Sequence, residues 1–241
     1  MGILVTIEGL DGAGKRTLVD ALIAELGEVR VATLAFPRYG ISVHADLAAE
    51  ALSGRHGDLA ASANAMAVLF ALDRADAGAA LRELLATHDL VILDRYVASN
   101  AAYGAARLHQ GARDEFVAWI GELEFDRFGL PRPDVQLLLD VPVEVAGERA
   151  RRRGESDRAR ALDAYERDSD LQKRTAAVYR ELADLCWRGS WWVIGPDDDV
   201  RTVAARLADL TRRGTVECGA SDAVEAGASD AVDPGASDVA R

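Results

Sequence analysis

The feature that most constrains this chain is a glycine-rich segment near its start, Gly9-Leu10-Asp11-Gly12-Ala13-Gly14-Lys15-Arg16-Thr17. An apolar run over residues 3–7 precedes it, and leucines at helical spacing follow it. A strand, a glycine-rich turn and a helix start together form an anion site, because free backbone N–H groups and the helix dipole point at the anion. The spacing Gly9-x4-Gly14-Lys15 fits a phosphate-binding loop, in which the lysine contacts the outer phosphates.

The loop departs from this pattern at one position. Arg16 stands where a Ser or Thr normally supplies a hydroxyl to magnesium, and Thr17 comes one position later. A glycine-rich turn between a strand and a helix can also bind nothing. Composition favours binding, because Lys15 and Lys173 are the only lysines among 28 basic residues. A lysine kept at this position in an arginine-rich chain indicates a role for its ammonium group.

Five apolar runs of strand length are spread along the 241 residues: 3–7, 30–35, 89–93, 135–140 and 191–194. Longer segments with helical periodicity separate them. Strands that alternate with helices predict an α/β fold with a parallel sheet covered on both faces. Ligands of such sheets bind at the carboxyl ends of the strands. Functional residues are therefore expected directly after each strand.

Charge and hydropathy exclude several classes of function. A net charge of −12 argues against general nucleic-acid binding, which needs a basic surface. No apolar run is long enough to cross a membrane, so we expect no membrane partner. The N-terminus begins a strand without a basic and apolar leader, which predicts a cytoplasmic protein. If the ligands are phosphates, positive charge must be concentrated locally.

Two segments that follow predicted strands carry arginines. Phe36-Pro37-Arg38-Tyr39 reads as a loop at the ligand edge, although it could be a simple turn with a solvated arginine. Asp94-Arg95-Tyr96 follows an apolar strand, and an Asp there resembles the second acidic element of phosphate-loop enzymes, which acts near magnesium. Arg95 could hold a phosphate with its planar fork. A buried structural Asp–Arg pair is the alternative.

Two predicted helices, the first of them over residues 59–86, each place polar and aromatic side chains on a shared face. Phe70 and Arg74 are four residues apart, so a ring and a guanidinium could stack on a nucleobase and bond its edge. Spacing alone favours the alternative, in which Phe70 is core and Arg74 pairs with a neighbouring aspartate. Asn100 and Tyr103 are three residues apart on another helix, where an amide could read the edge of a base.

The strongest basic cluster lies between residues 149 and 160, with six arginines against two carboxylates. Such a run is often only a solvated helix face. Gly154 and its small polar neighbours favour a mobile loop between two helices, and hence a lid over residues 147–160 that closes on phosphates. Carboxylates follow it at Asp163 and Glu166, close to Tyr165, and could anchor the lid or reach a magnesium ion.

The composition changes after residue 213. Residues 218–241 contain three copies of an eight-residue unit built on Gly-Ala-Ser-Asp. The unit is small, acidic and without aromatic residues, so it cannot bury enough surface to offset its ordering entropy. We expect one domain over residues 1–213 and a disordered acidic tail over residues 214–241.

Taken together, these motifs resemble the thymidylate kinases in their bacterial form, with an arginine-rich lid. The resemblance covers residues 3–210 and rests on the glycine-rich loop, Phe36-Pro-Arg-Tyr39, Phe70 with Arg74, Asp94-Arg-Tyr96, Asn100 with Tyr103, and the arginine lid. It implies the P-loop nucleoside monophosphate kinase fold, with a five-stranded parallel sheet flanked by helices. It also implies phosphorylation of dTMP to dTDP with Mg-ATP as donor, and a homodimer.

The resemblance assigns roles around the acceptor nucleotide. Phe70 would stack on thymine, Arg74 would bond a base carbonyl and Asn100 would read the N3 edge. Tyr103 would crowd the 2′ position and so favour deoxyribose. The remaining acceptor contacts would be Asp11 near the 3′-hydroxyl, Arg38, Tyr39 and Arg95 at the monophosphate, and Phe36 and Tyr165.

It also assigns roles around ATP and Mg²⁺. ATP would contact Gly12, Ala13, Gly14, Lys15, Arg16, Thr17, Arg149, Arg153 and Arg160. Catalysis would rest on Lys15, Arg16, Arg95, Arg153 and Asp11, and magnesium on Asp11, Asp163 and Glu166. Gly12 and Ala13 leave no arginine at the usual loop position, which indicates the family type whose catalytic arginine comes from the lid.

Two other functions stay open at this point. A related P-loop kinase could phosphorylate another nucleoside monophosphate, although Arg74 and Asn100 favour a pyrimidine with a 4-keto group. An ATP-binding switch module could hydrolyse ATP without an acceptor. The arginine lid and Asp94-Arg95-Tyr96 argue against that module.

Overall fold

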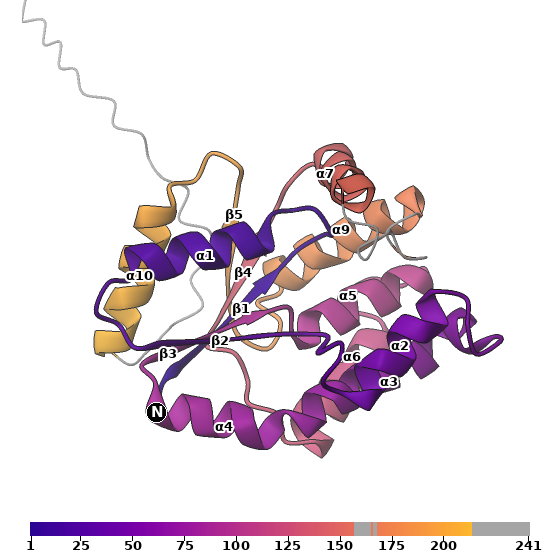
Figure 1. Ribbon diagram of the computed structural model, residues 1–241, viewed down its shortest axis with the longest axis horizontal. Helices are drawn as coiled ribbons and strands as arrows, with labels where there is room; N and C mark the ends of the chain where they lie inside the picture. The colour runs from indigo at the N-terminus through magenta and orange to yellow at the C-terminus, as the bar shows by residue number, and fades with distance from the viewer. Residues whose placement is uncertain (157–164, 166–167, 214–241) are drawn as a thin grey trace, which may run out of the picture.

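A five-stranded parallel sheet organises the computed structural model, which describes residues 1–156, 165 and 168–213 (Figure 1). Its strands are β1 (Ile3–Glu8), β2 (Val31–Ala35), β3 (Leu90–Asp94), β4 (Val135–Leu139) and β5 (Ser190–Ile194). Their order across the sheet is β2-β3-β1-β4-β5, and every pairing is parallel. The predicted fold class and all five predicted strands are confirmed, and no strand end differs from its predicted position by more than one residue.

Successive side chains of a strand point to opposite faces of the sheet. The strands therefore contribute residues to two separate hydrophobic cores, one on each face. Val5 and Ile7 of β1 face a core shared with α1 (Lys15–Glu25) and α10 (Val200–Arg213). Leu4 faces the other core, shared with α5 (Val97–Arg107) and α9 (Ser169–Asp184). Figure 1 shows α1 and α10 side by side on one side of the strands, with α5 and α9 on the other.

The remaining helices differ in part from the prediction. They are α2 (Val43–Leu52), η1 (Leu59–Ala61), α3 (Ala63–Asp76), α4 (Gly78–Thr87), α6 (Glu115–Gly121), the π-helical turn η2 (Glu122–Arg127) and α7 (Val143–Ser156). The helical segment expected over residues 59–86 is broken at Ser62, whose hydroxyl caps α3, and at Ala77. Helix α2 was not predicted.

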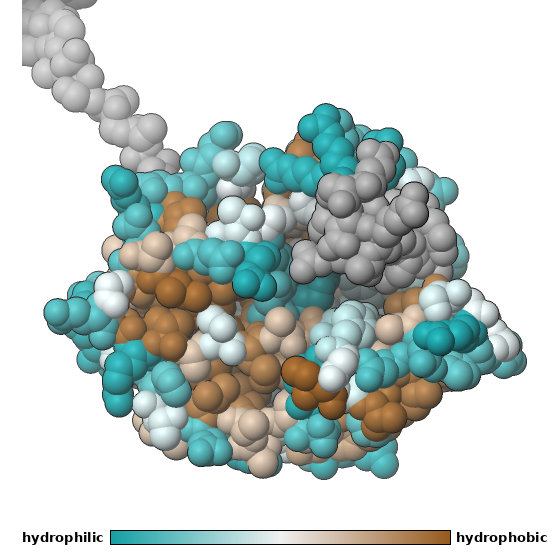
Figure 2. Space-filling model, viewed as in Figure 1, coloured by the Kyte–Doolittle hydropathy of each residue, from teal (hydrophilic) through white to brown (hydrophobic). Residues whose placement is uncertain are grey.

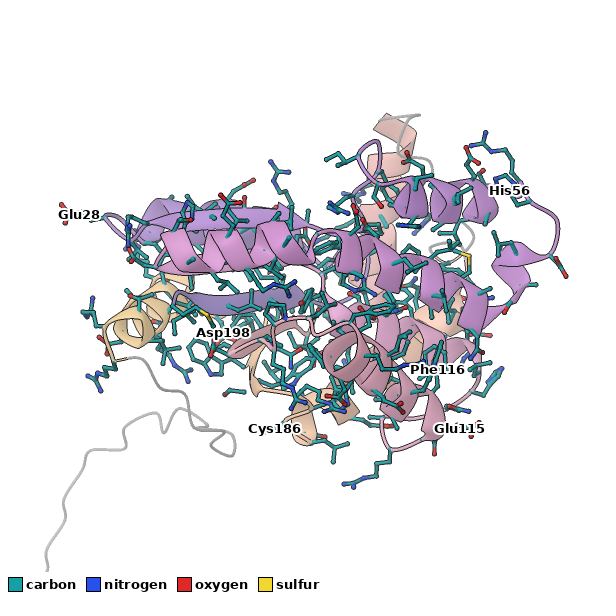
Figure 3. All side chains as sticks on the ribbon, turned by 90° about the horizontal axis from the view of Figure 1, so that it is seen from below. Glu28, His56, Glu115, Phe116, Cys186 and Asp198 are labelled. Atoms are coloured by element: carbon teal, nitrogen blue, oxygen red, sulfur yellow. The ribbon has the colours of Figure 1, made fainter. Side chains whose placement is uncertain are left out.

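The π-helical turn η2 is anchored behind α5 by the helix that precedes it. Phe116 of α6 packs so closely on α5 that a methyl group added to Gly104 would lie 2.1 Å from its ring (Figure 3). The same ring makes an edge contact with Trp119 at 5.4 Å between centroids. This packing fixes where the side chains of η2 enter the core that α5 and α9 share.

The lid prediction is corrected in one respect. We expected a loop around Gly154, but α7 continues through Gly154 to Ser156. Residues 157–164, 166–167 and 214–241 lie outside the described residues, so the rest of the predicted lid and the predicted tail lie there too. Among the helices that the structure describes, none has the length and apolar character needed to cross a membrane.

Candidate active site at the carboxyl edge of the sheet

The glycine-rich segment joins β1 to α1, as the sequence predicts. Gly9, Gly12 and Gly14 have φ angles of 136°, 80° and 102°, which L side chains rarely adopt, and α1 begins directly afterwards at Lys15. The Lys15 ammonium is buried and donates to the carbonyl oxygens of Gly9 at 3.2 Å and Leu10 at 2.8 Å. The loop therefore folds back on its own lysine, beside the free N–H groups at the start of α1.

Helix α7 packs directly on this loop. A methyl group added to Gly12 would lie 2.0 Å from the carbonyl oxygen of Ala146. Arg149, one turn further along α7, is exposed. The backbone of Arg153 belongs to the same helix, while its side chain and the whole of Arg160 lie outside the described part of the chain. The helix that carries the first predicted lid arginines thus starts against the phosphate loop.

Three predicted residues meet where β3 ends beside β1. The pairing of Ile7 with Asp94 brings Arg95 next to the loop. Arg95 donates from Nη2 to Asp11 Oδ1 at 2.5 Å and from Nη1 to the Gly9 carbonyl at 3.0 Å. The Tyr103 hydroxyl donates to Asp11 Oδ2 at 2.8 Å. Residues from the loop, from the end of β3 and from α5 therefore form one cluster, here called the Asp11 cluster: Asp11, Arg95 and Tyr103.

Electrostatics in the Asp11 cluster keep its carboxylate charged. Burial alone would raise the pKa of Asp11, but the positive charges of Arg95 and Lys15 outweigh burial and hold that pKa well below its usual range. For Lys15, burial and the neighbouring Arg95 lower the pKa to about 8, although Asp11, Asp94 and Glu8 act in the opposite direction. Near neutral pH, Lys15 therefore loses its charge more readily than Asp11 does.

Behind the cluster lies a buried carboxylate that sequence analysis missed. Glu8, the last residue of β1, accepts hydrogen bonds from the Tyr96 N–H at 2.9 Å, Ser99 Oγ at 2.6 Å and the Tyr179 hydroxyl at 3.1 Å. Ser99 Oγ in turn accepts from Arg95 Nη1 at 3.1 Å. Glu8 therefore helps to hold Arg95. The sequence signal that could have revealed Glu8 is a carboxylate at the end of an otherwise apolar run.

A second buried carboxylate joins the two predicted base-reading residues. Glu124 of η2 is fully buried and accepts from Arg74 Nε at 2.5 Å and Nη2 at 2.8 Å. It also accepts from Asn100 Nδ2 at 2.8 Å. The alternative in which Arg74 pairs with a neighbouring aspartate is wrong. Phe70, predicted to stack on the base, is half-buried on the same helix as Arg74.

The segment after β2 is held by aspartates of α3. Arg38 donates from Nε to Asp73 Oδ1 at 2.8 Å and from Nη2 to Asp76 Oδ2 at 2.6 Å. Phe36 is buried, with its ring 6.0 Å from that of Tyr96, while Tyr39 is about half exposed. Arg38 is therefore pre-positioned at the ligand edge by carboxylates rather than left free.

Tyr165 lies beside the Asp11 cluster. Its ring stacks on that of Tyr103 at 6.3 Å between centroids and 18° between planes. Arg107, which was not predicted, donates to the Tyr165 hydroxyl and lies over its ring. The structure thus brings together Asp11, Arg95, Tyr103 and Tyr165.

Groups that could hold a magnesium ion are present only in part. The buried Asp94 Oδ1 has no hydrogen-bond partner, and a metal ion would satisfy it. Asp163 and Glu166 lie outside the described residues, within which no group of three His, Cys, Asp or Glu side chains gathers. Arg16 is exposed and pairs with Asp20 at 3.2 Å. Its side chain therefore lies along α1.

Comparisons with known proteins agree on one family. The family model described as thymidylate kinase matches residues 7–205. The chain is 59% identical over 208 residues to the thymidylate kinase of Mycobacterium tuberculosis, which covers 86% of this chain and 97% of that protein. It is 40% identical over 186 residues to the enzyme of Xanthomonas oryzae pv. oryzae, covering 75% and 73% of the two chains.

A solved structure supports the same fold. The thymidylate kinase of Candida albicans superposes with a TM-score of 0.61 and 25% sequence identity, covering 88% of this chain and 92% of that one. The Candida albicans enzyme has broad substrate specificity.

Proposed function

The chain belongs to the thymidylate kinase family and phosphorylates dTMP, and we propose that the Asp11 cluster is where this acceptor meets the phosphate loop. The observation that supports this most directly is the position of Arg95. Its guanidinium touches both Asp11 and the Gly9 carbonyl, so one cation spans the loop and the end of β3. A phosphate bound there would lie between Arg95 and Lys15.

The donor is Mg-ATP. Lys15, which now donates to the loop's own carbonyls, would turn to the outer phosphates, and the N–H groups at the start of α1 would bind them. Asp94, with its unpartnered oxygen, suits a magnesium contact, as would Asp11, Asp163 and Glu166. When bound, the ion neutralises charge on the phosphates.

Catalysis rests on positioning and charge, because phosphoryl transfer passes through a loose transition state. An arginine on the transferring group contributes roughly 10³–10⁵ in rate, or about 4–7 kcal/mol of barrier. Lys15, Arg16 and Arg153 share this role, with Arg149 and Arg160 on the donor and Arg95 aligning the acceptor. Closing the lid would exclude water, the competing acceptor.

The base site is built from α3 and α5. Phe70 stacks on thymine, Arg74 donates to a base carbonyl, and Asn100 reads the N3 edge. Tyr103, whose hydroxyl is committed to Asp11, crowds the 2′ position. Arg38, Tyr39, Phe36 and Tyr165 complete the acceptor contacts.

At the level of the whole protein, the catalytic domain spans residues 1–213 and the acidic repeats form a tail. The enzyme acts in the cytoplasm as a homodimer. Exposed apolar side chains around the start of α2 and on α3 support the dimer: Ile41, Val43 and Val68. Figure 2 shows brown, apolar residues exposed on the face of the molecule that carries these helices.

The variant Arg95→Lys tests the acceptor site. A lysine cannot reproduce the bidentate fork, and each hydrogen bond to a charged group contributes about 1.5–3 kcal/mol. We expect kcat/KM for dTMP to fall roughly 100-fold or more, with the KM for ATP nearly unchanged.

Arg180→Lys is the matched control. Arg180 also makes a bidentate pair, with Asp140 at 3.0 and 2.6 Å, but outside the Asp11 cluster. We expect it to keep the activity of the unmodified enzyme. Equal kcat/KM values for dTMP in both variants would contradict the proposed role of Arg95.

A further inference from the structure

We propose that Glu124, which does not itself reach the base, decides which pyrimidine the site accepts by fixing the orientation of Asn100 and Arg74. The inference rests on the proposed function, in which those two side chains contact the base. It assigns Glu124 as a specificity-determining, positioning residue that favours a pyrimidine with an N3–H and a 4-keto group over one with a 4-amino group.

The geometry around Asn100 permits one orientation of its amide. Two groups lie within hydrogen-bond distance of one end of the amide: Glu124 Oε1 at 2.8 Å and the Ala67 carbonyl at 3.0 Å. A carboxylate and a backbone carbonyl can only accept. The NH₂ end of Asn100 must therefore face inward, and Oδ1 must face away from both.

The outward oxygen of Asn100 is open to a ligand. Within residues 1–156, 165 and 168–213, the buried side-chain atoms without a hydrogen-bond partner are Thr6 Oγ1, Ser42 Oγ and Asp94 Oδ1. Asn100 Oδ1 is not among them, and no described residue donates a hydrogen bond to it. The site thus presents a hydrogen-bond acceptor at this point.

Glu124 also fixes what Arg74 can offer. It binds Nε and Nη2, which leaves the two N–H groups of Nη1 for another acceptor. Arg74 is only 3% exposed and Glu124 is fully buried, so the pair is held in one arrangement by its surroundings. The same carboxylate therefore makes Asn100 an outward acceptor and Arg74 an outward donor.

This pattern matches one kind of pyrimidine. Thymine and uracil carry an N3–H donor beside a C4 carbonyl acceptor, which complement Asn100 Oδ1 and Arg74 Nη1. Cytosine reverses both groups, with an acceptor at N3 and a donor at C4. A site rejects a substrate analogue most strongly when that analogue leaves the site's buried polar groups unpaired. The discrimination is then on the order of 10⁴–10⁵-fold. The charge on Glu124 maintains the preference because a carboxylate cannot donate.

The test variant is Glu124→Gln. Whichever way a glutamine amide turns, its NH₂ faces an N–H of Arg74, while the Ala67 carbonyl still holds the Asn100 amide. Arg74 then loses its fixed orientation, so the site no longer presents a fixed donor opposite C4 and its preference for a 4-keto group weakens. We expect the ratio of kcat/KM for dTMP to kcat/KM for dCMP to fall at least 10-fold, measured as ADP release from Mg-ATP. The ratio for dTMP to dUMP should stay within twofold of its original value, because those bases differ by a methyl group.

Asp126→Asn serves as the matched control. Asp126 lies two residues away in η2 and pairs with Arg132 at 2.9 Å and Arg188 at 3.8 Å. It should leave both ratios unchanged. A role for Glu124 in folding alone would lower kcat/KM for all three acceptors by the same factor in Glu124→Gln, and that outcome would overturn the inference.

A second variant keeps the test decisive if Glu124→Gln fails to fold. Asn100→Ala removes the outward acceptor and leaves the Arg74–Glu124 pair in place, so the dTMP-to-dCMP ratio should again fall at least 10-fold. An unchanged ratio in Asn100→Ala would overturn the inference. Absence of dTMP turnover in the unmodified enzyme would instead refute the proposed function itself, so the two failures are distinguishable.

Discussion

Charged side chains that hold one another define the site at the scale of single residues. Asp11 stays ionised because Arg95 and Lys15 lie beside it, while Arg95 is oriented by Asp11 and by the Ser99 hydroxyl that Glu8 holds. Such preorganisation means that less reorganisation is needed when nucleotides bind. Lys15 is the member of this group whose charge is most easily lost.

The lowered pKa of Lys15 predicts a pH dependence. A lysine is charged when protonated, so a pKa of about 8 means that the free enzyme loses this charge as the pH rises through 8. We expect kcat/KM for ATP to decline above about pH 8, approaching tenfold per pH unit. The kcat should hold to higher pH, because phosphates of the bound nucleotide favour the charged lysine.

The variant Lys15→Arg is the control for this profile. A guanidinium remains charged throughout the range, so the decline above pH 8 should disappear even if the overall rate is lower. A kcat/KM for ATP that stays constant up to pH 10 in the unmodified enzyme would contradict the assignment of Lys15.

Which residues could be predicted depended on how far apart in sequence their partners lie. Asp11, Arg95 and Tyr103 each follow a predicted strand or open a predicted helix, and the family resemblance named them. Glu8 and Glu124 were missed, because their importance comes from contacts with residues 91 and 50 positions away, which no local pattern reveals. The charge of Glu8 at the end of an apolar run was the only local sign.

At the scale of elements, α7 packs closely on the phosphate loop, and the proposed lid begins on this helix. Strand positions were predicted well because each strand is a short apolar run bounded by polar residues. Helices in the β2–β3 connection were predicted less well, because an alanine-rich sequence does not show where a helix is broken. Ser62 breaks it by capping α3 with its hydroxyl, which accepts from the Ala65 N–H at 3.1 Å.

The variant Gly12→Ala tests the contact between α7 and the loop. Its φ of 80° costs an alanine about 1–2 kcal/mol, and the clash with the Ala146 carbonyl adds the about 1–3 kcal/mol typical of overpacking. We expect a loss of roughly 2–5 kcal/mol in the free energy of unfolding, measured by urea denaturation, and a raised KM for ATP.

Gly27→Ala provides the comparison, since Gly27 has a φ of 60° and open space around it just beyond the far end of α1. It should lose only about 1–2 kcal/mol and keep its KM for ATP. Equal losses in the two variants would show that the contact with α7 has no effect on stability.

At the scale of the whole molecule, an acidic chain places the positive charges of its proposed nucleotide site at one edge of the sheet. The net charge of −12 repels nucleotides at long range, so the proposed site relies on Lys15, Arg95 and the arginines of α7 to attract them. The sequence predicted the fold around this edge of the sheet. How α3, α5 and η2 meet at the proposed base site depends on tertiary packing, which the sequence pattern does not encode locally.

The most direct test of dTMP as the acceptor is ADP release from Mg-ATP with dTMP, dUMP, dCMP, dAMP, dGMP or no acceptor. We expect dTMP to lead. A pocket for one methyl group discriminates by only about 10–200-fold, so dUMP should follow measurably, with dCMP and the purine nucleotides far behind. Almost no ADP should appear without an acceptor. Equal ADP release in every reaction would identify an ATPase and contradict the base site described above.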